Sequence, residues 1–161
     1  MSDLANFFKP SSVAVVGASD KQGKIGHAIM KNMVSSGFKG KLYPINPKQT
    51  EIMGYKCYSS LKDLNKPVDL VVIAVPAQAV NAVATEAAQI GAKHLIVISA
   101  GFKEIGREGK EREKKLLNIC RKTGMHMLGP NCVGMIDTHT PINASFANGF
   151  PNKGHIAFIS Q

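Results

Sequence analysis

The clearest structural signal in the sequence is the run Asp69-Leu70-Val71-Val72-Ile73-Ala74-Val75. After Asp69 it is continuously apolar, which is typical of a strand in a parallel sheet whose two faces are both covered. Pro76 ends the strand, and the Ala-rich stretch 78–90 that follows has helical character and closes at Gly91. The sequence therefore predicts a buried strand followed by a helix in the middle of the chain.

The same alternation extends in both directions along the chain. Two further helices are predicted at 25–36 and 111–123, where apolar residues recur at helical spacing. Residues 137–154 are rich in Asn, Thr, Pro and Gly and are predicted to form a loop. Strands that alternate with helices predict an α/β domain with a mostly parallel sheet and right-handed crossovers. The remaining predicted strands are 13–16, 41–45, 94–98, 126–128 and 156–159.

Composition excludes several classes of protein. The 161 residues are 44% hydrophobic and 19% charged, which is typical of one globular domain. The longest fully apolar run, 70–75, is far too short to span a membrane, and the N-terminus lacks the pattern of a secretory signal, so we expect a cytoplasmic protein that does not bind membranes. Three cysteines without CxxC spacing argue against a disulfide framework and a metal site.

The net charge of +9 favours an anionic partner: nucleic acid, a membrane surface or a polyphosphate ligand. The basic residues are spread along the chain without a block, which is also typical of an ordinary solvated surface. The chain has no Trp and no cluster of aromatic residues that would stack on single-stranded nucleic acid. Only the charge supports nucleic-acid binding, and we expect none.

Ligands of open α/β sheets bind beyond the carboxyl ends of the strands, so the loops at those ends carry the functional information. The first is Gly17-Ala18-Ser19-Asp20-Lys21-Gln22-Gly23-Lys24-Ile25-Gly26, which lies between a strand and a helix. Its glycines permit close backbone approach, and the N–H groups at a helix N-terminus suit a phosphate. The spacing departs from G-x-G-x-x-G, and the alternative is an ordinary turn between strand and helix.

The second strand ends at Asn46-Pro47-Lys48. An NAD site usually places an acidic residue here, on the ribose 2′-hydroxyl. A lysine instead suits an additional phosphate on the ribose, as in NADP or coenzyme A. The alternative for Lys48 is a solvated surface lysine.

The remaining strand ends are Val75-Pro76-Ala77, Ser99-Ala100-Gly101-Phe102 and Gly129-Pro130-Asn131-Cys132-Val133-Gly134. In the last of these, Asn131 can donate a hydrogen bond to an oxygen. Cys132, taken by itself, is predicted to be a buried structural thiol. The five histidines show neither the arrangement of a catalytic triad nor metal-ligand spacing. These residues predict a binding domain that carries no catalytic groups of its own.

Five of these segments occur in one order that resembles a known family. They are Ser12-Val13-Ala14-Val15-Val16-Gly17-Ala18-Ser19, Ile45-Asn46-Pro47-Lys48, Val72-Ile73-Ala74-Val75-Pro76, Ser99-Ala100-Gly101-Phe102 and Leu128-Gly129-Pro130-Asn131-Cys132-Val133-Gly134. Together they resemble the coenzyme A-binding domain of NDP-forming acyl-CoA synthetases, above all the ADP-forming acetyl-CoA synthetases, to which the succinyl-CoA synthetase alpha subunit is related. The resemblance covers residues 1–161 and implies a Rossmann-like, doubly wound, mostly parallel sheet with helices on both faces.

The resemblance implies that coenzyme A lies along the carboxyl ends of the strands. Lys48 would pair with a phosphate of the coenzyme, and Asn131 and Cys132 would lie at the thiol end, where the acyl group is transferred. The residues expected at the pantetheine or phosphate region are Gly17, Ser19 and Gln22. The residues expected along the rest of the groove are Val75, Pro76, Ser99 and Ala100.

The family reaction interconverts acyl-CoA, ADP and phosphate with a free acid, CoA and ATP, through an acyl phosphate and a phosphorylated histidine. None of the histidines here matches that residue, and the family usually continues beyond Ser160-Gln161. We therefore expect the N-terminal fragment of an acid–thiol ligase (acetate–CoA ligase, ADP-forming) that binds coenzyme A and is inactive alone. ATP or ADP and Mg would be bound by the remaining synthetase domains or by a second subunit.

Two other functions stay open at this point. A CoA-sensing regulatory module, stand-alone or fused to an acetyltransferase, would share the fold. An NADP-dependent oxidoreductase would also suit Lys48, although the missing G-x-G-x-x-G pattern disfavours it. The loop at 129–134 favours the synthetase, because that loop serves the acyl-transfer end in the family.

Overall fold

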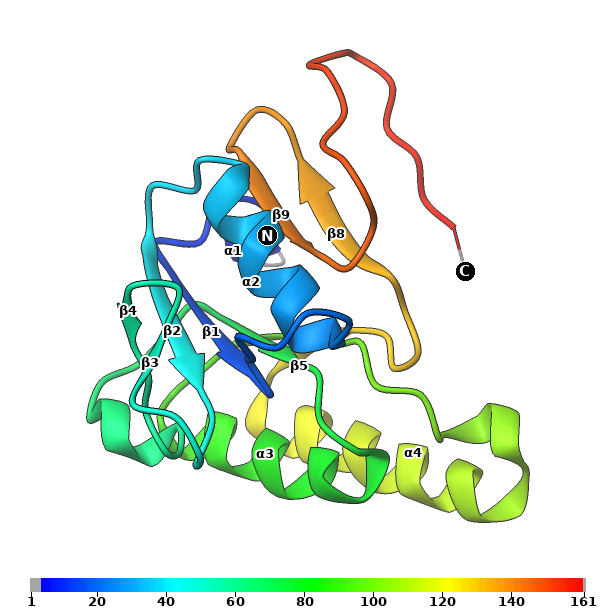
Figure 1. The fold of residues 1–161 in the computed structure, drawn as a ribbon. Helices are drawn as coiled ribbons and strands as arrows, with labels where there is room; N and C mark the ends of the chain where they lie inside the picture. The colour runs from blue at the N-terminus through cyan, green and yellow to red at the C-terminus, as the bar shows by residue number, and fades with distance from the viewer. Residues whose placement is uncertain (1–3, 161) are drawn as a thin grey trace.

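The centre of the molecule is a five-stranded parallel sheet in the order β2-β1-β5-β6-β7 (Figure 1). A computed structural model describes residues 4–160. The adjacent strands are in register, so that Val13 of the first strand lies between Leu42 and Leu70. The sheet strands are β1 (Ser12–Val16), β2 (Lys41–Ile45), β5 (Leu70–Ile73), β6 (His94–Val97) and β7 (His126–Leu128).

The two faces of the sheet are covered by different elements (Figure 1). Helices α3 (Ala77–Gln89) and α4 (Arg107–Thr123) pack on one face, and helix α2 (Ile25–Ser35) packs on the other together with an antiparallel hairpin. The hairpin strands are β8 (Gly134–Asp137) and β9 (Ile142–Ser145). The smaller elements are α1 (Ala5–Phe8), strands β3 (Glu51–Ile52) and β4 (Tyr55–Lys56), and the 3₁₀ turns η1 (Lys62–Leu64) and η2 (Lys103–Ile105).

Alternation along the central strands divides the core into two layers. In β1, Val13 and Val15 pack toward α2, whereas Ala14 and Val16 pack toward α3 and α4, and all four are buried. This is the arrangement that a continuously apolar strand requires. The prediction of an α/β domain with a mostly parallel sheet and helices on both faces is confirmed.

The helices follow the predicted patterns closely. In α3 the buried positions are spaced by three and four residues, at Ala77, Val80, Ala84 and Ala87, and their small side chains let the helix lie close to the sheet. Helix α4 ends at Gly124, which adopts φ 69° and donates its N–H to the carbonyl of Cys120. Glycine is favoured there because the left-handed conformation costs it no side-chain clash.

The proline in β2 is accommodated because this strand lies at the edge of the sheet. Pro44 lies beside Val15 of β1, and β2 has no sheet strand on its other side within the described residues. A proline cannot donate to a second neighbour, so an edge position suits it.

The prediction of a loop over 137–154 was wrong, because β8 and β9 lie within or beside this range. All four residues of β9 are buried, including Asn143 and Ser145. Their polar groups are satisfied inside the fold: Ser145 Oγ donates to Asn143 Oδ1 at 2.6 Å, and Asn143 Nδ2 donates to the carbonyl of Gly149 at 3.3 Å. Because two of the four buried residues of β9 are polar and paired inside the fold, an analysis of apolar periodicity does not detect the strand.

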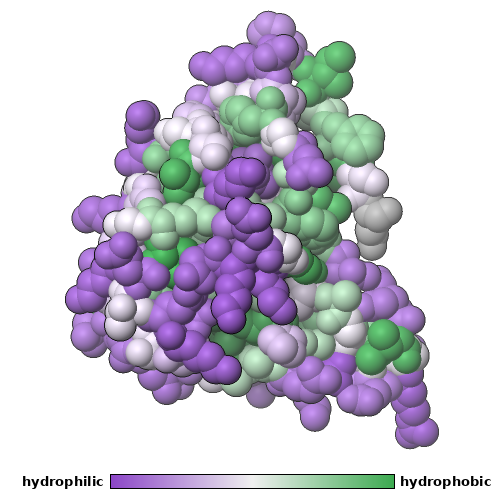
Figure 2. All heavy atoms as spheres, viewed as in Figure 1, coloured by the Kyte–Doolittle hydropathy of each residue, from purple (hydrophilic) through white to green (hydrophobic). Residues whose placement is uncertain are grey.

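The prediction of a strand at 156–159 was also wrong. The segment has no regular secondary structure, and Ile156, Phe158 and Ile159 are 96%, 89% and 94% exposed. Figure 2 shows hydrophobic groups at the upper right, where Figure 1 places this end of the chain. A strand needs a neighbour to pair with, and no strand within residues 4–160 pairs with this segment. Within the same residues, no helix has the length and apolar character of a membrane span.

Candidate functional site

The loops singled out in the sequence lie together at one edge of the sheet. Because β2, β1, β5, β6 and β7 run parallel, their carboxyl ends all open onto that edge. The chain crosses this edge in the loops at 17–24, 46–50, 74–76, 98–102 and 129–133. This is the edge at which ligands of open α/β sheets bind.

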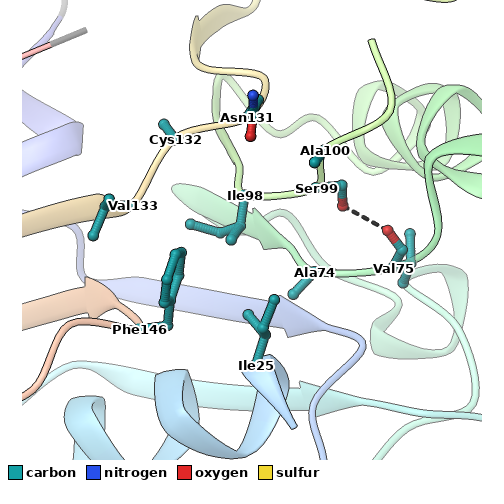
Figure 3. A pocket seen from close by; sticks show the side chains of 10 residues that line it. All are labelled: Ile25, Ala74, Val75, Ile98, Ser99, Ala100, Asn131, Cys132, Val133 and Phe146. Carbon is teal, nitrogen blue, oxygen red and sulfur yellow. Dashed lines mark hydrogen bonds between the residues drawn. The ribbon is translucent and has the colours of Figure 1, made fainter. Parts of the chain in front are cut away.

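A pocket of about 390 Å³ lies at the ends of β5 and β6 (Figure 3). Its floor and walls are mostly apolar, with an amide, a hydroxyl and a thiol among them. This is the character of a small-molecule site, in which few polar groups fix the orientation of a ligand. The residues that line it are Ile25, Ala74, Val75, Ile98, Ser99, Ala100, Asn131, Cys132, Val133 and Phe146.

The structure brings half of the predicted site residues into this pocket and places the others elsewhere along the same edge of the sheet. Gly17, Ser19 and Gln22 lie in the neighbouring loop after β1, Lys48 lies beyond the end of β2, and Pro76 precedes α3. The predicted residues that line the pocket are Val75, Ser99, Ala100, Asn131 and Cys132.

Sequence reasoning missed the residues that reach the pocket from other elements. Ile25 opens α2, and Phe146 follows β9, so both come from far along the chain (Figure 3). Phe146 is 37% exposed and Val133 is 54% exposed, so both keep apolar surface that a ligand in the pocket could cover. The only sequence signal for Phe146 was its apolar character within a polar stretch.

The loop after β1 is packed tightly against its neighbours. Gly17 adopts φ +88°, and a Cβ atom there would lie 2.4 Å from the carbonyl oxygen of Ala74. Gly26 is similarly confined, since a Cβ atom would lie 1.9 Å from the carbonyl oxygen of Gly17. Only glycine permits this contact between strand, loop and helix, and it brings the backbone N–H groups of the loop and of α2 to the edge.

Charged side chains of the 3₁₀ turn η2 and of helix α4 hold the loop after β6 in place. The Arg112 guanidinium donates to the carbonyl oxygen of Gly101 and pairs with Glu108. Glu104 Oε1 accepts the N–H groups of Gly101 and Phe102 at 2.5 Å and 3.1 Å, and these hydrogen bonds hold the pKa of the Glu104 carboxyl below its ordinary value.

The same loop is anchored inside the molecule as well. The Phe102 side chain is fully buried between the sheet and the helices α3 and α4. Removing a buried Phe side chain costs about 3–5 kcal/mol, so this anchor is strong. Ser99 Oγ donates to the carbonyl oxygen of Val75 at 2.6 Å, which joins the ends of β5 and β6 across the pocket wall (Figure 3).

The loop after β7 presents Asn131 and Cys132 to the pocket. Asn131 adopts φ 56° and donates its backbone N–H to the carbonyl oxygen of Ser99 at 3.1 Å. The Cys132 thiol donates to the carbonyl oxygen of Val97 at 3.4 Å, and burial raises its pKa above the ordinary value of 9.0. At neutral pH this thiol is therefore protonated, which suits a structural group and not a nucleophile.

The pocket contains hydrogen-bonding groups but no acid or base that titrates near neutral pH. None of the histidines lies among its lining residues, and His94 and His126 stack on each other at the opposite edge of the sheet. The part of the chain that the structure describes holds no group of three His, Cys, Asp or Glu residues suited to a metal ion. The arrangement can bind and orient a ligand by shape and hydrogen bonds.

Fold and site together define an α/β domain with a pocket at the carboxyl edge of its parallel sheet. The family model described as CoA binding domain matches residues 11–138, so the chain belongs to the CoA-binding-domain family.

Two curated relatives resemble most of the chain. An acetate–CoA ligase (ADP-forming) of Methanocaldococcus jannaschii is 47% identical over 94% of this chain and 21% of its own length. The alpha subunit of acetate–CoA ligase (ADP-forming) II of Pyrococcus furiosus is 43% identical over 98% of this chain and 34% of its own length.

A solved structure is also similar to most of this chain. The dinucleotide-forming acetyl-coenzyme A synthetase 1 of Ca. Korarchaeum cryptofilum, in complex with phosphate and ADP, superposes with a TM-score of 0.86 and 44% identity, covering 91% of this chain and 31% of that one. The chain thus spans about a fifth to a third of the length of these proteins.

Proposed function

We propose that this chain binds coenzyme A along the carboxyl edge of its sheet, as the CoA-binding domain of an ADP-forming acyl-CoA synthetase of the acetate–CoA ligase type. The observation that carries the proposal is the order of features along that edge. A lysine lies beyond the end of β2, a glycine-rich loop follows β1, and the apolar pocket lies at β5 and β6. Membership in the CoA-binding-domain family supports the same ligand.

Coenzyme A has two chemically different ends, and the edge offers a different environment to each. The phosphates suit Lys48 and the loop that contains Gly17, Ser19 and Gln22. The pantetheine arm suits the apolar groove at Val75, Pro76, Ser99 and Ala100. From β2 to β6 the edge crosses three strand spacings, or about 14 Å. An extended ligand with a charged end and an apolar end fits that span.

At the thiol end, Asn131 and Cys132 orient the sulfur and the acyl group by hydrogen bonding and contact. Proton and phosphoryl transfer belong to other residues, which we assign to further synthetase domains or to a second subunit. Those parts would also bind ATP or ADP with Mg. Relatives several times longer than this chain, and a relative that is itself one subunit, support this division.

Isothermal titration calorimetry with CoA, and with NADP as a parallel ligand, tests the proposal. We expect micromolar affinity for CoA and no heat with NADP. NADP binding without CoA binding would favour the oxidoreductase instead, because Lys48 would then serve a 2′-phosphate. A chain that binds neither ligand also contradicts the proposal.

A further inference from the structure

One side chain connects the two loops at the phosphate end of this edge. Asn46 directly follows β2, and its amide nitrogen Nδ2 donates to the carbonyl oxygen of Ala18 at 2.8 Å. Its amide oxygen Oδ1 accepts the backbone N–H of Lys48 at 2.9 Å. The amide group therefore joins the loop after β1 to the backbone of the lysine after β2.

The backbone of Asn46 is fixed as well. Its N–H donates to the carbonyl oxygen of Tyr58 at 2.9 Å, and its carbonyl oxygen accepts the thiol of Cys57 at 3.6 Å. Ala18, at the other end of the bridge, is fully buried. The Asn46 backbone and the Ala18 carbonyl are thus both held by the fold, and the Asn46 side chain connects them to the backbone of Lys48.

We propose that Asn46 is a positioning residue that holds Lys48 in place for the 3′-phosphate of coenzyme A. The inference rests on the proposed function, since it assigns Asn46 a role at that site. The Lys48 side chain is exposed and its long stem is free to rotate, so its contribution to binding depends on where its backbone is held. Asn46 uses both atoms of its amide within the protein and acts through Lys48.

The sharpest test is a double-mutant cycle in the 161-residue chain. Asn46→Ser keeps an oxygen close to the N–H of Lys48 and is too short to reach Ala18, so it breaks the bridge without adding charge. We expect Asn46→Ser to raise the Kd for CoA about fivefold, the effect of one hydrogen bond. In a chain that carries Lys48→Ala, the same change should alter the Kd by less than about twofold, because the group that Asn46 positions is gone.

Dephospho-CoA separates failure of this inference from failure of the proposed function. If the unmodified chain does not bind CoA, the proposed function fails. If it binds CoA and dephospho-CoA equally, Lys48 does not hold the 3′-phosphate and the inference fails. If it prefers CoA but Asn46→Ser has no effect, or the same effect in both backgrounds, only the positioning role of Asn46 is rejected.

Two further variants control for stability. Ser12→Ala removes a comparable bridge at the opposite edge of the sheet, where Ser12 Oγ accepts the N–H of Asp69 at 3.0 Å. It should lower the thermal stability of the chain and leave the ratio of the two Kd values unchanged. Asn46→Thr presents the same hydroxyl as Asn46→Ser and repeats the cycle if the serine variant does not fold.

Discussion

The carboxyl edge of the sheet has two halves that are built in different ways. The polar half consists of the loops 17–24 and 46–50 at β1 and β2, which are largely solvent-exposed and are joined by the amide of Asn46. The apolar half is the pocket at β5 and β6, with Phe146 and Ile25 on its rim. Both halves are held by packing and hydrogen bonds, but the first offers backbone N–H groups and a lysine, whereas the second offers a mostly apolar surface.

This difference shows how one sheet edge can accommodate a ligand with unlike ends. A phosphate needs N–H groups and a cation near solvent, and the polar half offers them without burying a charge. A pantetheine arm gains from removal of apolar surface from water, which a lined pocket provides. If the proposed function is correct, changes in the two halves must affect different parts of the same ligand.

The largest effect is expected at the point where the two halves meet. Gly17→Ala places a Cβ atom 2.4 Å from the carbonyl oxygen of Ala74, whereas Gly23→Ala, at a similar φ of +80°, meets nothing within 4 Å. Both variants carry the cost of a left-handed alanine, about 1–2 kcal/mol. We expect Gly17→Ala to lose at least about 2 kcal/mol more in the free energy of unfolding, because the backbone must shift.

Urea denaturation of the two variants measures this difference. Gly23→Ala is the matched control, since it shares the loop, the conformation and the substitution. Equal losses in the two variants would mean that the contact between the loop and β5 is not confined as the structure indicates. A folded Gly17→Ala chain with unchanged affinity for CoA would remove this loop from the binding site.

In the polar half, Lys48→Ala should weaken CoA binding about tenfold, the effect of one charge-assisted contact near solvent. Dephospho-CoA should be affected far less if Lys48 meets the 3′-phosphate. Calorimetric titration with both ligands gives the two ratios directly. Equal losses for the two ligands would reject that assignment of Lys48.

In the apolar half, Phe146→Ala should weaken CoA binding about threefold to fivefold, because the substitution removes an aromatic ring that lines the pocket. The effect is modest because the ring is already 37% exposed. CoA and dephospho-CoA should lose equally, and 3′,5′-ADP, which lacks the pantetheine arm, should bind as before. The same calorimetric titrations check this pattern. A loss of affinity for 3′,5′-ADP would show that the two halves are not independent.

The smallest effect is expected on stability when the pH is lowered. The folded pKa of Glu104 lies below its ordinary value of 4.5 because the carboxylate accepts N–H groups of Gly101 and Phe102. Its contribution to stability is therefore present above pH 4.5 and is lost as the pH falls through the lowered folded pKa.

The variant Glu104→Gln should accordingly be less stable than the unmodified chain at pH 7, and the difference should shrink below pH 4. Thermal unfolding at a series of pH values measures this. A difference that is constant across that range would mean that the charge of Glu104 has no part in holding the loop after β6.

Much of the fold could be predicted because the strands of a parallel sheet are buried on both faces. The run at 69–75 and its counterparts needed no tertiary information, and the parallel arrangement then placed the strand-end loops at one edge. Pro44 lies in the edge strand β2, which is a position that proline tolerates in a sheet.

The remaining features depend on tertiary partners that the sequence does not name. Strand β9 was hidden because Asn143 and Ser145 satisfy each other inside the fold. The apolar run at 156–159 looks like a buried strand, yet no strand within residues 4–160 pairs with it. Phe146 lines the pocket together with Ile98, and Asn46 donates to the carbonyl of Ala18. Folding brings each pair together from distant parts of the sequence, so no local pattern identifies them.

The central claim is that one coenzyme A molecule occupies both halves of the edge. Titration of the ¹⁵N-labelled chain with CoA, followed by amide chemical shifts, tests it most directly. The account predicts saturable shifts in the loops at 17–24 and 46–50 and also at Ser99, Ala100, Asn131 and Cys132, all with one dissociation constant. Shifts confined to one half, or to the opposite edge at His94 and His126, would contradict it.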